Sequence, residues 1–526
     1  MVELKRKSSG ENLFSMEVGR RVFCDGHYGT IRFVGEVPPT KGLWLGIDWD
    51  HPLRGKHDGT YNGVQYFTAS FPKSGSLVRP EKLNFGYSIV ETIRSRYATP
   101  QNEEDKAKAE ESIQEVQKAI KARFFETVGF NKLEAHLSHL QSLVIVSLAG
   151  LPVNGPGPLP ELQLVCPNIS ELDLTHTLLH SWDSVAAIAG QLVNLTILSI
   201  SENRLAPPED CELVRPAFDS LQTLIMARCG YNWADILSLS KMWPKIKHLK
   251  VRFNTISELS EPSDTLLDLE SLDLEGNIIS WEDVENLSKL SNFKSLNLTN
   301  THLHDITVTR SLDSYFPALK HLNITSNSIS GWLPVSELNK LPQLEELRFK
   351  KNPLLDLGDC SPETMRQLII ARIANLKVLD GTAVAASERS GAENDYVNLY
   401  GPVWIEAIKS DDKKARFLAY HPRYLDLIKK YGAPESQDGV KKSSLVTVHL
   451  CTGDSNGPSH TRKLPLSMLV HRLVNLVQRV FNIGNQNITL SYVSSKNPEQ
   501  EYIFNNNLKP LSFYSVADDD KIIVRW

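Results

Sequence analysis

The sequence predicts a multidomain fold with three parts: a small all-β barrel, an α/β solenoid of short repeats, and a mixed α/β domain with one central helix. Three observations predict it. A chain of 526 residues is too long for one hydrophobic core. One apolar pattern recurs through its middle. The flanking segments differ from it, because short glycine- and aromatic-rich strands precede the repeats and alternating strands around an amphipathic helix follow them.

The overall composition excludes several classes of protein. Hydrophobic content of 41% and charged content of 23% are ordinary for a globular protein, and 57 basic against 62 acidic residues argue against a nucleic-acid binder. Six dispersed cysteines without a CxxC pair predict neither a disulfide framework nor a metal site. The charged N-terminus predicts no secretory signal, and apolar stretches such as 140–153 are too short to insert into a membrane. We therefore expect a cytoplasmic protein.

The first part, residues 18–86, is rich in glycine and aromatic residues. Its short apolar runs are separated by glycines, which predicts a small antiparallel barrel. These runs read VGRRV, YGTIRFVG, LWLGIDWD, GKHDG, GVQYF and GSLVRP. Nine basic and six acidic groups give this part a net charge of +3, against −8 for the remainder (−5 minus +3). A basic module on an acidic chain favours acidic ligands.

These motifs resemble the CAP-Gly domain family. The resemblance rests on an ordered set of matches: Trp44–Asp50, then Gly55-Lys56-His57-Asp58-Gly59, then Gly63, Tyr66 and Phe67, then Gly75, Val78, Arg79 and Pro80. It implies binding to the acidic, aromatic-ended tails of α-tubulin and of end-binding proteins. The expected tail-binding residues are Trp44, Trp49, Lys56, His57, Asp58, Gly59, Phe67 and Arg79.

The residue types in this module suit such a ligand. Lys56 supplies a countercharge for a carboxylate, and the glycines let backbone N–H groups approach it. Trp44, Trp49 and Phe67 are expected to wall a slot for the terminal aromatic ring. His57 stands where the family usually has Asn, and its imidazole gains charge near pH ~6.5. The alternative for His57 is a residue that only shapes the turn.

Residues 87–132 are expected to form a helical connector, and 133–387 a leucine-rich-repeat solenoid. The repeated pattern is apolar-x-x-apolar-x-apolar-x-x-Asn/Thr/Cys-x-apolar. Successive copies lie 23 to 26 residues apart, which matches the leucine-rich-repeat period. The copies start at residues 143, 169, 195, 221, 246, 269, 293, 319 and 344.

Two recurring residue types in the repeats are expected to be structural. Asparagines at the turn should bond backbone groups that no neighbouring strand can satisfy, and so form a ladder. These are Asn203, Asn254, Asn277, Asn327 and Asn352. Tryptophans after the turn are expected in the core rather than in a ligand box, and these are Trp182, Trp233, Trp281 and Trp332.

The concave face of the solenoid is the expected partner surface, because residues that alternate with the strand leucines meet solvent there. Its charges change sign along the repeats, which favours a protein partner over a nucleic acid. The candidates are His248, Lys250, Arg252, Asp273, Glu275, Arg348 and Lys350, with Glu171, Asp173 and Glu346 on the same face. An ordinary solvated face is the alternative.

The last parts are a cap and linker over 388–442 and a domain over 443–526. HPRY at His421–Tyr424 belongs to the expected cap. Two alternating strands, the amphipathic run LVHRLVNLVQRVF and further strands are similar to a ubiquitin-like β-grasp. The domain ends at Trp526 without Gly-Gly, so we expect a binding domain rather than a conjugated tag.

The three domain types in this order resemble the tubulin-folding cofactor E family. The resemblance implies a non-enzymatic, ATP-independent and cytoskeleton-associated chaperone that needs no small-molecule cofactor. It would bind α-tubulin and, with the tubulin cofactors D, C and B, build and dismantle the αβ heterodimer. Two alternatives stay open: a microtubule-associated adaptor, and a ubiquitin-pathway shuttle whose ubiquitin-like domain contacts the proteasome. An enzyme is disfavoured because the sequence has no GxxxxGK[ST], HExxH or GxSxG motif.

Overall fold

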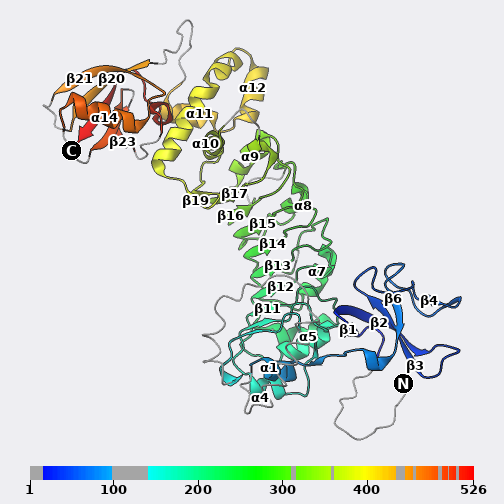
Figure 1. Cartoon of the computed structure of the whole chain (residues 1–526). Helices are drawn as coiled ribbons and strands as arrows, with labels where there is room; N and C mark the ends of the chain where they lie inside the picture. The colour runs from blue at the N-terminus through cyan, green and yellow to red at the C-terminus, as the bar shows by residue number, and fades with distance from the viewer. Residues whose placement is uncertain are drawn as a thin grey trace. The chain divides into compact units, whose positions relative to one another are not determined.

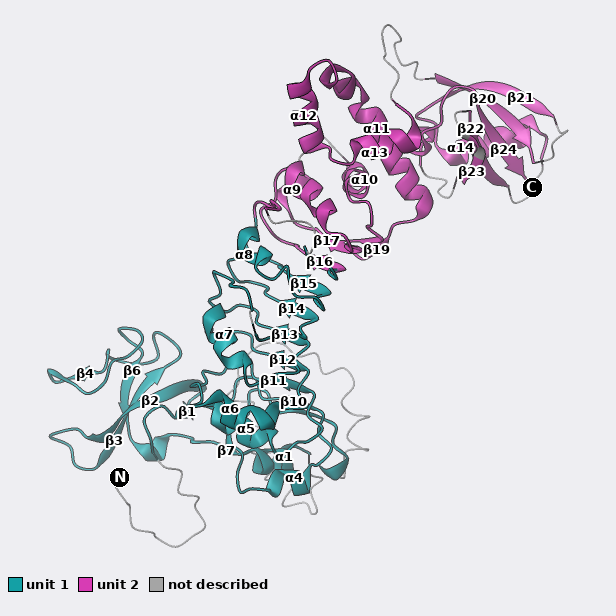
Figure 2. Ribbon diagram, turned by 180° about the vertical axis from the view of Figure 1, so that it is seen from behind, with its two compact units in different colours: residues 1–303, 313–319 teal, residues 304–312, 320–526 magenta. Residues whose placement is uncertain are grey.

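The computed structural model describes residues 16–97, 140–262, 264–309, 315–356, 361–433, 445–453, 458–483, 488–495, 497–504 and 509–526. The chain divides into two compact units, residues 1–303 with 313–319, and residues 304–312 with 320–526 (Figure 2). Within the described ranges, no helix is both long and apolar enough to span a membrane.

Unit 1 begins with the barrel, an antiparallel sheet in the order β1-β2-β3-β6 (Figure 1). Its core consists of Val22, Ile31, Leu45, Ile47, Trp49 and Leu83. A two-stranded hairpin, β4-β5, lies beside the sheet. The strands are β1 Arg21–Cys24, β2 His27–Glu36, β3 Leu43–Trp49, β4 Thr60–Tyr61, β5 Val64–Gln65 and β6 Gly75–Val78, followed by the 3-10 turn Pro80–Lys82. The predicted all-β barrel is confirmed.

A short connection joins the barrel to the solenoid. Strand β7 (Tyr87–Ser88) pairs in parallel with β9 (Val153–Gly155), and helix α1 (Ile89–Tyr97) follows β7 directly. The Tyr97 hydroxyl donates to the backbone C=O of Ser147 at 3.1 Å and accepts from its N–H at 3.0 Å, which ties α1 to the first repeat. Residues 98–132 of the predicted connector lie outside the described residues.

Each predicted repeat contributes a three-residue strand that begins two residues after its predicted start. The central residue of each strand, from Val146 to Leu347, is buried. In unit 1 the parallel strands are β8 Ile145–Ser147, β10 Glu171–Asp173, β11 Ile197–Ser199, β12 Thr223–Ile225, β13 His248–Lys250, β14 Ser271–Asp273 and β15 Ser295–Asn297. In unit 2 they are β16 His321–Asn323, β17 Glu346–Arg348 and β18 Val378–Leu379, with the antiparallel β19 Thr382–Ala383. The predicted solenoid is confirmed.

The asparagine ladder is also confirmed. Asn277, 1% exposed, donates to the C=O groups of Val251 and Leu274 at 3.0 and 2.9 Å. Its side-chain oxygen accepts from the N–H groups of Asn254 and Ile256 at 3.1 and 3.3 Å. The same bonding to backbone of its own or the preceding turn recurs at Asn203, Asn254 and Asn352, and Asn327 bonds the backbone of its own turn. Each turn therefore satisfies its buried backbone through a side chain.

Short helices follow the turns, and capping residues explain where several of them begin. Asn232 and Ser280 form capping boxes with Asp235 and Asp283, and Ser181 caps α5. The helices are α4 Glu161–Val165, α5 Trp182–Ala189, α6 Cys211–Val214, α7 Trp233–Ser240, α8 Trp281–Glu285 and α9 Trp332–Glu337. Shorter 3-10 turns are Leu140–Ser142, Arg215–Phe218, Leu338–Lys340 and Pro353–Asp356.

Four of these helices, α5, α7, α8 and α9, begin with a tryptophan, and three of the four tryptophans have the predicted core role. Trp182, Trp233 and Trp281 are at most 4% exposed. Trp332 differs, because it is half-buried and packs against the cap, where the Arg372 guanidinium lies 4.7 Å from its ring centroid.

The cap of unit 2 is a group of helices around an aromatic core. The helices are α10 Pro362–Arg372, α11 Ala386–Ala407, α12 Asp411–Tyr420 and α13 Tyr424–Tyr431. Glu393 is 1% exposed and pairs with Arg423 at 2.8 Å and Lys430 at 2.9 Å. Burial alone would raise the pKa of Glu393, but hydrogen bonds from Lys430 and Arg423 hold it below the ordinary value. Glu393 therefore stays ionised and links α11 to α13.

His421, from the predicted HPRY segment, lies in the same core. It is 9% exposed, its Nδ1 is 2.6 Å from the Tyr396 hydroxyl, and its ring stacks on Phe417. Burial, with a smaller contribution from the nearby Arg372 charge, lowers the pKa of His421 to about 4. His421 is therefore neutral at pH 7.

The C-terminal part of unit 2 is a five-stranded sheet in the order β21-β20-β24-β22-β23, with β20 and β24 parallel. The elements are β20 Leu445–Thr452, β21 Ser459–Pro465, α14 Val470–Val480, β22 Thr489–Ser494, β23 Asn497–Ile503, the 3-10 turn Leu511–Tyr514 and β24 Asp520–Arg525. Helix α14 buries Val470, Leu473 and Val477 against the sheet. The predicted ubiquitin-like β-grasp is confirmed.

We predict that Asn277→Ala lowers the free energy of unfolding by about 3 kcal/mol, because four backbone groups each lose a hydrogen bond and, within the described part of the chain, only the Leu274 C=O keeps another, from the residue 277 N–H. Urea denaturation followed by circular dichroism measures the change. Asn300→Gly is the control, because Asn300 is exposed and its left-handed backbone, with a φ of 54°, is one that Gly tolerates. A loss below ~0.5 kcal/mol for Asn277→Ala would contradict the role of the ladder.

We predict that acid destabilises the cap through His421. Its pKa is lower in the folded state than its unfolded value near 6.5, so its contribution is complete above pH ~6.5 and is lost as the pH falls toward 4. The full contribution is about 3 kcal/mol. Thermal melting of the full chain between pH 7.5 and 4.5 checks this, with His421→Gln as the matched variant. Equal pH dependence in both chains would refute the prediction.

Candidate functional site

The Gly55–Gly59 loop of the barrel is pinned to strand β6. The N–H groups of Lys56 and His57 donate to the C=O of Gly75 at 2.8 and 3.2 Å, and the Gly75 N–H donates to the C=O of His57 at 2.8 Å. These backbone donors are occupied within the chain. The expectation that the loop N–H groups meet a ligand carboxylate is therefore wrong for Lys56 and His57, whose donors serve the loop itself.

Gly59 is required at its position by geometry. Its φ is +105°, and a Cβ there would lie 1.9 Å from the backbone oxygen of Phe67. The Tyr66 N–H donates to the C=O of Gly59 at 3.1 Å. Gly59 therefore lets the loop lie directly on the segment that carries Tyr66 and Phe67.

His57 has a clear role in this loop. Its Nδ1 accepts a hydrogen bond from the Gly59 N–H at 3.0 Å, so that nitrogen carries no proton. Partial burial, together with the Lys56 charge, lowers the pKa of His57 against the opposing effect of Asp58. The His57 imidazole therefore gains its charge at a lower pH than the value near 6.5 that the sequence predicts. The hydrogen bond supports the turn-shaping interpretation.

The charged residues of the loop point outward. Lys56 and Asp58 are exposed. The Asp58 carboxylate accepts from the Thr60 N–H at 3.0 Å, and hydrogen bonds at Thr60 lower the pKa of Asp58. Asp58 therefore shapes the turn, and Lys56 is left as the cation that can meet an anionic ligand.

An aromatic face lies beside the loop. The Phe67 ring covers Gly46 of β3, where a Cβ would lie 2.5 Å from it, and the Phe33 Cβ would lie 2.8 Å from the same position. Phe33 also contacts Tyr66, with 5.2 Å between ring centroids. Trp44 is two residues before Gly46 and so lies on the same face of β3. Phe33 and Tyr66 are not among the residues predicted for the site. In the structure Phe33 lies opposite Gly46 of the neighbouring strand, and an aromatic residue opposite a strand glycine is a recurring arrangement in sheets.

Arg79 and Trp44 form one edge of this face. The Arg79 guanidinium lies 4.0 Å from the Trp44 ring centroid and donates to the C=O groups of Leu43 and Lys41 at 3.0 and 2.9 Å. The Trp44 Nε1–H donates to the Thr40 hydroxyl at 2.8 Å. The arrangement holds a cation flat on an aromatic ring, a geometry that suits planar and anionic groups.

Trp49 does not share this face. It is 1% exposed and packs in the barrel core with Val22 and Ile31. Its position along β3 differs from those of Trp44 and Gly46 by odd numbers, five and three, so its side chain points to the opposite side of the strand. The prediction that Trp49 lines the aromatic slot is therefore wrong, because its side chain lies in the barrel core.

The predicted solenoid residues of unit 1 are largely paired with one another. Arg252 contacts Asp273 at 2.5 Å and Glu275 at 3.5 Å, and Asp273 also accepts from the Asn297 amide at 2.9 Å. His248 and Lys250 are half-buried on β13. In unit 2, Arg348 is exposed and pairs with Glu346 at 3.2 Å, and Lys350 is exposed.

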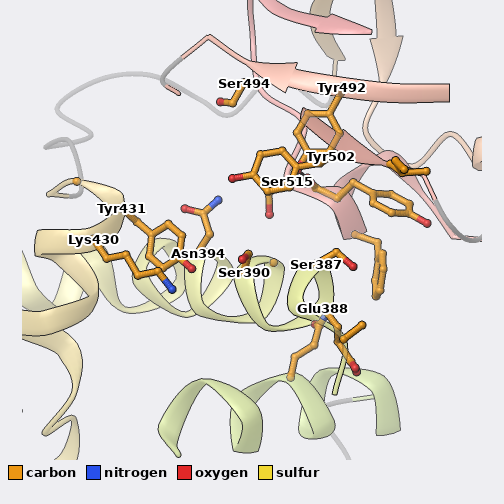
Figure 3. A pocket seen from close by; sticks show the side chains of 17 residues that line it. Ser387, Glu388, Ser390, Asn394, Lys430, Tyr431, Tyr492, Ser494, Tyr502 and Ser515 are labelled. Atoms are coloured by element: carbon orange, nitrogen blue, oxygen red, sulfur yellow. Dashed lines mark hydrogen bonds between the residues drawn. The ribbon is translucent and has the colours of Figure 1, made fainter. Parts of the chain in front are cut away.

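A recess of about 690 Å³ in unit 2 lies between α11 and the C-terminal sheet (Figure 3). Its polar lining is engaged within the chain: Lys430 and Tyr431 both bond Glu393, Glu388 pairs with Arg366, and Ser515 donates to Asp395. Because these groups already have partners, we favour the barrel face as the functional site.

Comparisons with known proteins agree with the domain types. Residues 18–83 match the CAP-Gly domain family, and residues 234–404 match the leucine-rich repeat family. The chain is 39% identical over 525 residues to tubulin-specific chaperone E of Danio rerio, covering 97% of this chain and 99% of the relative. It is 36% identical over 527 residues to tubulin-specific chaperone E of Homo sapiens, covering 97% and 98%. It is also similar to the solution structure of the C-terminal ubiquitin-like domain of mouse tubulin-specific chaperone e, with 32% identity, a TM-score of 0.15, and coverage of 17% of this chain and 93% of that one.

We predict that NMR titration of the His57 imidazole in the full chain gives a pKa below 6.5, and that Lys56→Met raises this pKa. Because the folded-state pKa is lowered, the Gly59–His57 hydrogen bond is intact above pH ~6.5 and is lost as the pH falls through the folded pKa. His57→Asn assigns the signal. A His57 pKa at or above 6.5 would contradict this geometry.

Proposed function

The chain belongs to the tubulin-specific chaperone E family, and we propose that it is a non-catalytic tubulin-folding chaperone whose barrel holds the acidic, aromatic-ended tail of α-tubulin. The observation that carries this proposal is the aromatic face of Trp44, Phe33 and Phe67, with Arg79 stacked on Trp44 and the exposed Lys56 on the loop that lies on Phe67. A peptide that ends in acidic residues and one aromatic ring matches both properties.

The proposed binding mode follows from the geometry of the loop. Carboxylates near the end of the tail meet Lys56 and Arg79, and the terminal ring packs against the aromatic face. Gly59 and the His57 hydrogen bond hold the loop on Phe67, which is buried, so the half-buried Trp44 and Phe33 are the rings that a ligand can reach. Asp58 faces solvent and disfavours ligands that place a second acid next to the loop.

The distribution of charge supports an acidic ligand for the barrel. Residues 18–86 carry a net charge of +3 and the remainder carries −8. Long-range attraction therefore steers an acidic tail toward the barrel and away from the rest of the chain. This attraction weakens as salt is added.

We further propose that the chain acts with the tubulin cofactors D, C and B to assemble and dissociate the αβ-tubulin heterodimer, in the cytoplasm and in association with the cytoskeleton. On this proposal a protein partner contacts two sets of solenoid residues. In unit 1 these are His248, Lys250 and Arg252 with its partners Asp273 and Glu275, and in unit 2 they are Arg348 and Lys350. The half-buried Lys250 is the strongest of these candidates, because a cation in such a position gains most from a partner carboxylate.

We predict that Lys56→Glu in the full chain weakens binding of an α-tubulin C-terminal peptide by about tenfold, which corresponds to one ion pair replaced by repulsion. Removing the terminal aromatic residue of the peptide should weaken binding to the wild-type chain by a similar factor. Fluorescence anisotropy with a labelled peptide measures both effects.

The matched control is Lys82→Glu, which makes the same charge change at an exposed residue of the turn Pro80–Lys82, outside the Gly55–Gly59 loop in the sequence. It should leave the affinity within about twofold after correction for net charge. Equal affinity for the intact and the trimmed peptide would rule out the proposed mode. Binding to polymerised microtubules with no binding to the soluble dimer would favour an adaptor instead.

A further inference from the structure

In unit 1, the third residue after each strand from β10 to β15 has a left-handed backbone. We call this set the turn row: His176, Glu202, Arg228, Phe253, Gly276 and Asn300, with φ between 52° and 72°. The residue that follows is in three cases a ladder asparagine, Asn203, Asn254 or Asn277. The ladder therefore fixes the backbone of the row and turns its side chains toward solvent.

Phe253 is unusual in this row. A bulky aromatic residue is disfavoured in the left-handed region, where Gly or Asn costs little. The next member is Gly276, and the Phe253 ring lies over it, so that a Cβ at Gly276 would be 2.2 Å from the ring. Phe253 nonetheless stays 37% exposed. The chain thus keeps a strained and exposed aromatic side chain where a smaller residue would be more stable, which points to a function of the ring.

Contacts run along the row from the barrel. The Tyr28 ring of β2 lies 4.2 Å from the His176 ring, and His176 Nδ1 is 2.9 Å from the Glu202 carboxylate. The Arg228 guanidinium is 3.7 Å from Glu202 and lies 4.4 Å from the Phe253 ring centroid. The row is therefore continuous with the module that carries the aromatic face.

Two further contacts fix the barrel at the head of the row. The Tyr28 hydroxyl donates to the C=O of Gly150 at 3.1 Å, and burial raises the pKa of Tyr28 to about 12. Arg204, next to the ladder residue Asn203, lies 3.4 Å from Asp50 of the barrel. Asp50 also pairs with the buried Arg21. These contacts join the barrel to the head of the row within unit 1.

The charges around Arg228 and Phe253 are complementary to an acidic ligand. The carboxylates there already have partners, since Glu202 bonds His176 while Asp273 and Glu275 pair with Arg252. Arg228 is more than half exposed and only loosely paired with Glu202. Lys250, in the next repeat, has no ion pair within the described part of the chain. Among the described residues here, Arg228 and Lys250 are therefore available to an external acidic group, whereas the carboxylates of Glu202, Asp273 and Glu275 are already paired.

We propose that Arg228, Phe253 and Lys250 form a docking surface for an acidic segment, with an apolar side chain, on the folded body of the partner whose tail the barrel holds. An Arg stacked on an exposed aromatic ring is typical of residues that dominate protein interfaces. This inference rests on the proposed function, because it takes the tail and the body from one partner. Two contacts made by one unit raise the effective concentration of the second.

The test uses full-length variants Arg228→Gln and Phe253→Asn, with Asn300→Gly as the control at the same row position. Asn tolerates the left-handed backbone, so Phe253→Asn removes the ring without added strain. Biolayer interferometry measures binding of purified tubulin dimer, of dimer trimmed of its tails, and of the isolated tail peptide. Each test variant should bind intact and trimmed dimer about tenfold more weakly, with unchanged affinity for the peptide.

The outcomes separate this inference from the tail-binding proposal. Unchanged dimer affinity in both test variants, with melting temperatures no lower than wild type, overturns the docking surface. Equal losses in Asn300→Gly also overturn it, because the effect would then belong to the turns in general. Absence of peptide binding by the wild-type chain overturns the tail proposal alone, since the trimmed dimer still reports on the row.

Discussion

The solenoid depends on one hydrogen-bonding constraint. Where each parallel strand ends, the backbone turns inside a dry core, and its N–H and C=O groups need partners that no strand supplies. A buried asparagine such as Asn277 supplies a donor and an acceptor at once, and so joins two adjacent turns. The bonding holds the preceding residue in the left-handed region, where its side chain must face solvent. The interactions that stabilise the core therefore also build the exposed row at Arg228 and Phe253.

The barrel uses a comparable constraint at a smaller scale. The loop that carries Lys56 is held by backbone bonds to Gly75 and by the imidazole of His57, and Gly59 lets it lie on Phe67. The loop backbone is thus committed to internal bonds, and recognition is left to side chains, Lys56 and Arg79 around an aromatic face. In the barrel and in the solenoid alike, hydrogen bonds between backbone groups and buried side chains fix the turns. The side chains that these turns expose remain available to bind a partner.

Much of this could be predicted from the sequence, because periodic patterns report local physics. The spacing of leucines predicted the positions of the parallel strands β8 and β10 to β17, and the turn asparagines predicted their own bonding. Tertiary detail could not be predicted in the same way. Trp49 looks like a partner of Trp44 in the sequence, but strand alternation places it in the core. The lowered pKa of His57 depends on its partial burial in the folded loop, and the position of the Phe253 ring depends on Gly276 in the next repeat.

The central claim is that one tubulin partner contacts both the barrel loop and the turn row. Hydrogen–deuterium exchange of the full chain, with and without saturating tubulin dimer, tests it most directly. We expect added protection in peptides that cover 55–67 and in those that cover 226–254, with little change in the repeats around Asn300. Protection confined to the barrel would contradict the proposed contact at the turn row. Absence of protection at 55–67 would contradict the proposed binding of the tubulin tail by the barrel.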